Sequence, residues 1–215
     1  RWRLGEAPHE MTLVREDAEN AVSLRRGFFL GDGTGCGKGR QIAAVIADNM
    51  AQGRTRALWL SRNDALLEDA RRDWGAIGGG AHDIVPLSSW KQGDAIRLDR
   101  GVLFTTYATL RQAARGGRQS RLDQIVAWLG EDFEGVIAFD EAHAMANAAG
   151  GGKGARGTKK ASQQGMAGLA LQNRLPDARV LYVSATGATT AENLAYAARL
   201  GLWGGPDAPF MSRPD

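Results

Sequence analysis

A glycine-rich segment with a single lysine is the first feature of the sequence that could do chemistry. Residues 31–39 read GDGTGCGKG and lie between an apolar run and a segment of helical period. Glycines let backbone N–H groups converge on an anion, and a helix N-terminus adds partial positive charge. Lys38 adds a charge suited to the β- and γ-phosphates of a nucleotide. The predicted phosphate-binding residues are Gly33, Thr34, Gly35, Cys36, Gly37, Lys38 and Gly39.

Two positions depart from the common phosphate-loop pattern. Asp32 stands where the pattern has its first glycine, and Gly39 stands where a Ser or Thr hydroxyl contacts Mg²⁺. Cys36 is either a small residue that fits a tight loop or a thiol whose oxidation would block the nucleotide. The sequence therefore leaves open how this loop would hold the metal.

A second group of reactive residues follows a predicted buried strand. Residues 136–143 read VIAFDEAH, so the strand ends in two adjacent carboxylates, Asp140 and Glu141. Asp140 suits Mg²⁺ binding through water, because hard cations take oxygen ligands. Glu141 is placed to orient and deprotonate an attacking water. The alternative is a pair of acids that cap the next helix, but Lys38 upstream favours a catalytic set of Glu141, Lys38 and Asp140.

A third candidate lies at the tip of another apolar strand, at Ser184 and Thr186, followed by Gly187. Its hydroxyls could sense the γ-phosphate, or they could belong to an ordinary turn that starts a helix. On its own, His143 fits either a helix start or a role in the site. The order of the three segments along the chain favours a role in coupling for Ser184 and Thr186, while for His143 the residues alone leave both interpretations open.

The elements that must position these residues alternate between strand and helix. Strands buried on both faces are predicted at residues 27–30, 57–60, 102–106, 136–139 and 180–183. Amphipathic helices are predicted at about residues 42–50, 63–74 and 122–129. Such alternation predicts an α/β fold with a mainly parallel sheet between two layers of helices. Ligands should then bind at the carboxyl ends of the strands.

Composition sets limits on the class of protein. The 215 residues carry 27 basic and 24 acidic side chains, a net charge of +3, which is too small to establish nucleic-acid binding. Near-average apolar and charged fractions exclude a globally disordered chain. One cysteine excludes an internal disulfide framework and indicates a reducing, cytoplasmic setting. The excess of arginine over lysine favours a bacterial source, and the absent initiator methionine indicates a piece of a longer protein.

The chain divides into three parts. Residues 1–26 are polar and aperiodic, and we predict no regular structure for them. Residues 27–204 form the predicted nucleotide-binding domain, and residues 205–215 form a tail that leads to a further domain. Within the domain, residues 147–161 predict a flexible basic loop, which is either a solvated linker or a contact for nucleic acid.

The chain resembles the first RecA-like domain of superfamily 2 helicases and translocases. The resemblance lies in three segments that follow each other in the same order: the glycine-rich loop, the DEAH sequence at 140–143 and the SAT sequence at 184–186. Longer stretches between residues 27 and 204 are similar to the strawberry notch family, in which Gly39 is typical. The resemblance implies a three-layer RecA-like P-loop NTPase domain that uses ATP and Mg²⁺. It also implies two partners: DNA or RNA, with DNA favoured, and a second RecA-like domain of the same protein. No membrane partner is expected.

The resemblance also implies roles for individual residues, among them a coupling role for His143. Contacts to the nucleic-acid backbone are expected at Ser61, Arg62, Asn63, Thr105 and Thr106. We therefore predict the ATP-binding domain of a nucleic-acid-dependent ATPase. Two alternatives stay open: an ATPase that remodels protein or nucleoprotein complexes without unwinding, and an ATP-binding scaffold with little turnover. Stimulation of ATP hydrolysis by nucleic acid would separate the first function from both alternatives.

Overall fold

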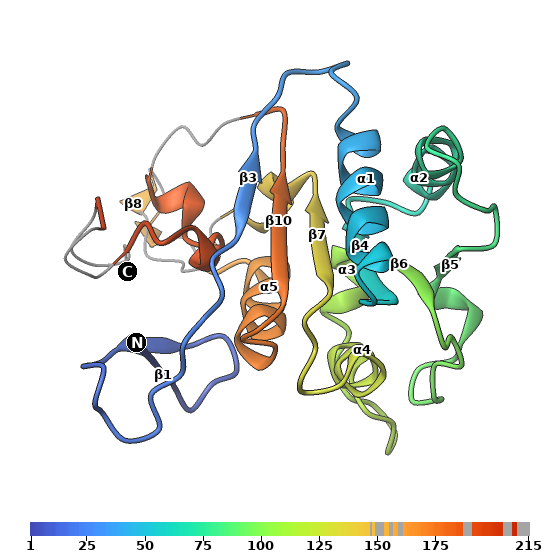
Figure 1. Ribbon diagram of the computed structural model, residues 1–215. Helices are drawn as coiled ribbons and strands as arrows, with labels where there is room; N and C mark the ends of the chain where they lie inside the picture. The colour runs from blue at the N-terminus through green and yellow to red at the C-terminus, as the bar shows by residue number, and fades with distance from the viewer. Residues whose placement is uncertain are drawn as a thin grey trace.

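A six-stranded parallel sheet forms the centre of the computed structural model (Figure 1). The structure describes residues 1–146, 148, 153–154, 157–158, 161–186, 191–203 and 208–209. The strands of the central sheet are β3 (Phe28–Leu30), β4 (Arg56–Ser61), β5 (Ile84–Pro86), β6 (Gly101–Thr106), β7 (Val136–Asp140) and β10 (Arg179–Val183). They lie in the order β3-β10-β7-β4-β6-β5.

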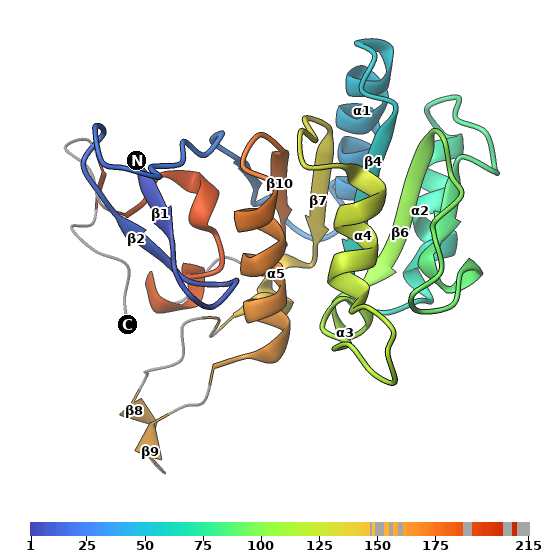
Figure 2. The ribbon, with the colours of Figure 1, turned by 90° about the horizontal axis from the view of Figure 1, so that it is seen from below.

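Helices cover both faces of the sheet, as Figure 2 shows. The helices are α1 (Lys38–Ala51), α2 (Leu66–Gly75), α3 (Tyr107–Leu110), α4 (Arg121–Leu129) and α5 (Gln163–Arg174). One core cluster joins α1 and α2 to one face, and a second joins α3, α4 and α5 to the other. In α1, Ile42, Ala43 and Ile46 are fully buried on one stripe, as the helical period predicts. The predicted three-layer α/β fold with a parallel sheet is confirmed.

The strand order brings the three chemically interesting segments together. β10 lies between β3 and β7 and pairs with both in parallel. Val183 pairs with Leu30 on one side and with Asp140 on the other, so all three strands end at the same level. The segments that follow these strands therefore share the carboxyl edge of the sheet, where parallel α/β proteins bind ligands.

The prediction that every strand is buried on both faces is wrong for β3. Phe28 is 64% exposed, because β3 forms an edge of the sheet and pairs only with β10 within the described residues. An edge strand with apolar residues has the same sequence pattern as a central strand. The sequence pattern therefore identified the strand but not its place in the sheet.

Several elements were not predicted. Residues 1–26, for which no regular structure was predicted, contain β1 (Trp2–Leu4) and β2 (Met11–Leu13), which pair antiparallel. The short β5 and α3 and the longer α5 were also missed. In α5 the buried face includes Gly168, Gln172 and Asn173, so no apolar stripe marks the helix.

The predicted basic loop and C-terminal tail lie mostly outside the described residues. Within 147–161, Lys153–Gly154 (β8) and Gly157–Thr158 (β9) pair antiparallel, and Ala148 is buried. Within 205–215, only residues 208–209 are described.

A buried arginine ties the segment after β10 to the rest of the domain. Arg199, in the 3₁₀ helix Ala198–Leu200, is 1% exposed, and burial lowers its pKa to about 10. Its guanidinium donates to the backbone carbonyls of Arg25, Gln172, Leu175, Pro176 and Ala178. Its own carbonyl accepts from the N–H of Gly27 at 2.7 Å. Arg199 therefore links the end of α5 to the chain that enters β3.

We expect Arg199→Lys to lower the free energy of unfolding by about 3 kcal/mol. An ammonium group has three donors at a single point and cannot reach five carbonyls, so buried acceptors are left unpaired. Urea unfolding followed by circular dichroism measures the loss. The same substitution at exposed Arg111 is the control and should change stability by less than about 0.5 kcal/mol. Equal effects at the two positions would show that the Arg199 hydrogen bonds do not stabilise the fold.

Candidate nucleotide-binding site

The loop between β3 and α1 has the backbone geometry of an anion cradle. Gly35 and Gly37 have positive φ angles of 85° and 72°, a conformation that residues with a side chain rarely adopt. Helix α1 begins directly after Gly37. A Cβ placed on Gly33, Gly35 or Gly37 would meet nothing within 4 Å, so the space beside the loop is open. The loop and the first N–H groups of α1 therefore surround a site suited to phosphate.

Lys38 folds back over this loop. Its ammonium donates to the backbone carbonyls of Asp32 at 3.0 Å and Gly33 at 2.8 Å. Gln41 donates to the Asp32 carboxylate at 2.8 Å and so ties the start of the loop to α1. The departure from the common pattern at position 32 thus has a structural role. The Lys38 charge therefore lies within the loop.

The acid pair follows β7 at the same edge. Asp140 Oδ2 accepts from the Ser61 hydroxyl and Oδ1 from the Glu141 N–H, both at 3.0 Å. Burial raises the pKa of Asp140, and the Ser61 hydrogen bond opposes that rise. Glu141 has a left-handed backbone with φ of 50°, which is uncommon for a residue with a side chain and is frequent at functional sites.

These residues fit a nucleoside triphosphate with Mg²⁺. The open glycine loop and Lys38 match the phosphates, and a partly buried carboxylate such as Asp140 is the hard oxygen donor that Mg²⁺ prefers. A cation would also offset the cost of burying the Asp140 charge. The hydroxyl that the common loop pattern supplies is absent at Gly39.

Two of the three predicted coupling residues, His143 and Thr186, each contact the third, Ser184. His143 Nδ1 is 3.0 Å from the Ser184 hydroxyl and 3.3 Å from Glu141 Oε2. The Ser184 hydroxyl in turn donates to the backbone carbonyl of Thr186 at 3.0 Å. Ser184 is fully buried. A continuous set of contacts therefore runs from the carboxylate of Glu141 to the end of β10.

The predicted nucleic-acid contacts divide into two groups. Arg62 and Asn63 are exposed directly after β4, at the same edge of the sheet. Ser61 is fully buried, and Thr105 and Thr106 are each 3% exposed. The Thr106 hydroxyl accepts from the N–H of Thr109 and caps α3. The hydroxyls of these three residues are buried, so a contact to the nucleic-acid backbone at these strand ends stays a prediction, in which backbone N–H groups would make the contact.

Sequence reasoning missed the contacts that hold Asp140 in place. The hydroxyl of Tyr107 donates to the backbone carbonyl of Asp140 at 2.7 Å, and its ring stacks on Phe139. Tyr107 is 1% exposed, and burial raises its pKa. Together with Ser61, it fixes Asp140 from the ends of β4 and β6. The only sequence signal was that polar residues end both strands.

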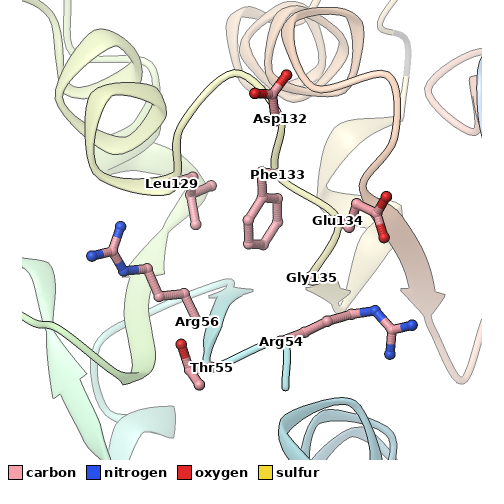
Figure 3. A pocket seen from close by; sticks show the side chains of 8 residues that line it. All are labelled: Arg54, Thr55, Arg56, Leu129, Asp132, Phe133, Glu134 and Gly135. Atoms are coloured by element: carbon pink, nitrogen blue, oxygen red, sulfur yellow. The ribbon is translucent and has the colours of Figure 1, made fainter. Parts of the chain in front are cut away.

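A separate pocket lies at the amino ends of β4 and β7, away from the phosphate loop. It is lined by Arg54, Thr55, Arg56, Leu129, Asp132, Phe133, Glu134 and Gly135. Figure 3 shows the Phe133 ring pointing into the pocket and the two guanidinium groups pointing away from it. Arg56 donates instead to the carbonyls of Asp99 and Trp128. The guanidinium groups of the pocket are therefore not placed to bind a phosphate inside it.

The fold and the site define a RecA-like P-loop NTPase domain. The family model described as P-loop containing NTP hydrolase pore-1 matches residues 6–215. Curated relatives are the strawberry notch homologues 1 of chicken, 44% identical over 198 residues, and 2 of human, 46% identical over 190 residues. FORGETTER 1 of Arabidopsis thaliana is 41% identical over 188 residues. The chain therefore carries the domain described as P-loop containing NTP hydrolase pore-1, and it belongs to the strawberry notch family.

Each of these alignments covers 86–89% of the chain but only 13–16% of the relative. The relatives come from animals and a plant, so they do not support the predicted bacterial source. Among the described residues, no helix is long and apolar enough to cross a membrane.

Solved structures with the same fold include a SWI2/SNF2 ATPase core and a helicase domain. The SWI2/SNF2 ATPase core of Sulfolobus solfataricus, solved with double-stranded DNA, has a TM-score of 0.57 and 18% identity. The Hef helicase domain of Pyrococcus furiosus has a TM-score of 0.53 and 17% identity. These matches cover 84% and 89% of the chain, and 33% and 36% of the solved chains. At such identity the likeness shows the fold alone.

Proposed function

We propose that this chain is the ATP-binding domain of a nucleic-acid-dependent ATPase that works as a helicase or translocase. One observation carries the proposal: the loop with Lys38 and the acid pair Asp140 and Glu141 lie on the two sides of β10, at one edge of the sheet. Phosphate groups held by the loop would then extend toward the carboxylates. This arrangement suits phosphoryl transfer to water, which depends on positioning and on charge neutralisation.

Each residue has a distinct task in this proposal. Lys38 exchanges its two carbonyl partners for the β- and γ-phosphates and neutralises part of their charge. Asp140, held by Ser61 and Tyr107, binds Mg²⁺ through water. When bound, Mg²⁺ supplies further charge neutralisation at the phosphates. Glu141 orients the attacking water and accepts its proton.

The contact between Glu141 and His143 gives the site a route to the end of β10. His143 contacts both Glu141 and Ser184, so movement of the β10 end would change the position of the general base. We assign His143, Ser184 and Thr186 the role of relaying the state of the γ-phosphate. Arg62 and Asn63, exposed at the same edge, are the proposed contacts to the nucleic-acid backbone, which position a strand without reading its sequence.

DNA is the favoured nucleic acid, and a second RecA-like domain is the proposed protein partner. Two solved structures of the same fold, the SWI2/SNF2 core and the helicase MrfA, are described as bound to DNA. The chain spans about one-seventh of its curated relatives, which leaves ample length for a further domain. A facing arginine from that domain would stabilise the transition state.

We expect residues 1–215 to hydrolyse ATP at least about 1,000-fold more slowly than the longer protein, because an arginine from a facing domain contributes roughly 10³–10⁵ in other nucleotide hydrolases. The measurement is turnover per active site for both proteins with saturating nucleic acid. Equal rates would show that the site is complete in one domain and would contradict the two-domain proposal.

The same assay separates the alternatives. Hydrolysis in the longer protein that does not respond to DNA or RNA would favour remodelling of protein complexes. ATP binding without hydrolysis in the longer protein would favour a scaffold.

A further inference from the structure

The structure explains why the phosphate loop has glycine at position 39. A Cβ built on Gly39 would overlap Asp73 Oδ2 and lie 3.0 Å from Asp73 Cγ. Asp73 belongs to α2, which packs beside α1 on the same face of the sheet. A Ser or Thr at position 39 would require Asp73 to move. A carboxylate oxygen from α2 therefore fills the space into which a side chain at this position would extend.

Asp73 lies between Arg40 and the start of α1. Its carboxylate is 18% exposed, and Oδ1 is 3.6 Å from the Arg40 guanidinium. Directly after it, Trp74 is 4% exposed and donates to the Asp83 carboxylate at 2.9 Å, which anchors the end of α2. One oxygen of Asp73 thus faces Arg40, and the other faces Gly39 at the start of α1.

We propose that Asp73 supplies the Mg²⁺ oxygen ligand that a Ser or Thr hydroxyl supplies in the common phosphate loop. Mg²⁺ in nucleotide sites is bound by one or two carboxylates together with the phosphates and waters, so a direct contact from Asp73 can accompany the water-mediated contact of Asp140. The inference rests on the proposed function, because it assigns a ligand to the same ATP and Mg²⁺ site. In this protein a carboxylate from the neighbouring helix α2 would thus take the place of a hydroxyl at position 39 of the loop.

A carboxylate ligand at Asp73 would change how strongly ATP binding depends on Mg²⁺, whereas an Asp73 that only supports the loop would not. Without metal, the negative charge of Asp73 beside the loop repels the phosphates of ATP. With Mg²⁺, the same charge strengthens binding. Nucleotide affinity should therefore depend more steeply on Mg²⁺ than it would in a loop that uses a neutral hydroxyl.

The test is calorimetric titration of the full-length protein with ATP, once with Mg²⁺ and once with a chelator. The quantity compared is the gain in affinity that Mg²⁺ gives. We expect Asp73→Ala to reduce this gain on the order of 10-fold, the scale seen when groups around a bound metal are removed, while affinity in chelator does not fall. Gly39→Ser alone should also lose the gain, because its side chain collides with Asp73. The double variant Gly39→Ser/Asp73→Ala should regain it, because a hydroxyl then has room to bind the metal.

Asp69→Ala is the matched control on the same helix, since the Asp69 side chain is 49% exposed and is paired only with Arg72 in the described structure. It should leave the Mg²⁺ gain unchanged. Thermal melting shows whether the Asp73→Ala variant is folded. If it is not, Asp73→Asn, which keeps the volume of the side chain, takes its place and should show the same reduced gain in affinity from Mg²⁺.

Two results would overturn the inference. An equal loss of affinity with Mg²⁺ and with chelator would show that Asp73 only supports the shape of the loop. A double variant with no regained Mg²⁺ gain would show that the Asp73 oxygen does not replace the hydroxyl. Failure of the proposed function would look different, because the unsubstituted protein would then bind no ATP in either condition.

Discussion

Lys38→Ala is expected to abolish measurable ATP binding, with a loss of affinity of about 100-fold or more. The ammonium of Lys38 is the side-chain cation within the loop, and hydrogen bonds to charged groups are worth about 1.5–3 kcal/mol each. Its present partners are backbone carbonyls of the loop, so its removal leaves no buried group uncompensated. Calorimetric titration with ATP and Mg²⁺ measures the effect.

Lys91→Ala is the control, because Lys91 is an exposed lysine remote from the loop in the sequence. It should bind ATP as the unsubstituted protein does. An unchanged affinity for ATP in Lys38→Ala would contradict the assignment of residues 33–39 as the phosphate-binding site.

Glu141→Gln is expected to keep ATP binding and to slow hydrolysis by about 10²–10⁴-fold in the intact protein. Glutamine preserves size but cannot accept the proton of the attacking water. Its contact with His143 can be retained, so the local structure should survive. Asp140→Asn should act differently and weaken the Mg²⁺-dependent part of ATP binding, because it removes a ligand charge from the metal site.

Glu131→Gln, at an exposed site before β7, is the matched control and should leave both quantities unchanged. Single-turnover hydrolysis and calorimetric binding together separate the two roles. If turnover stayed intact in both Glu141→Gln and Asp140→Asn, the acid pair would be a helix cap and not the catalytic pair.

The fold was predictable because its central strands and main helices have clear periodic patterns. The runs that contain Leu58, Leu103 and Ile137 are apolar in sequence and fully buried in the structure. The edge strand β3 was read as a central one, because Phe28 is apolar but exposed. The helix α5 was not predicted, because glycine and amide side chains make up much of its buried face.

The candidate site was predictable wherever consecutive residues carry it. The phosphate loop and the acid pair each lie within one segment of sequence, and β10 brings the two to one edge. The supporting contacts come from remote segments and leave no local signal. Ser61 and Asp140 are 79 residues apart, and Tyr107 and Asp140 are 33 residues apart. The overlap of Gly39 with Asp73 likewise needs the packing of α2 on α1.

Buried hydroxyls show a further limit of sequence reasoning. Thr105, Thr106 and Ser61 end parallel strands, where polar residues often contact ligands. In this protein, Thr106 caps α3 and Ser61 binds Asp140, so strand-end hydroxyls serve the architecture of the site. Polarity at a strand end identifies the functional edge of the sheet but not whether a side chain faces outward.

A crystal structure of the protein with Mg²⁺ and a non-hydrolysable ATP analogue tests the central claim most directly. We predict that the phosphates lie against residues 33–39, with Lys38 turned from the carbonyls of Asp32 and Gly33 onto the phosphates, and with the γ-phosphate facing Asp140 and Glu141. A nucleotide bound elsewhere, such as at the amino-end pocket of Arg54 and Arg56, with Lys38 still on its two carbonyls, would contradict the account.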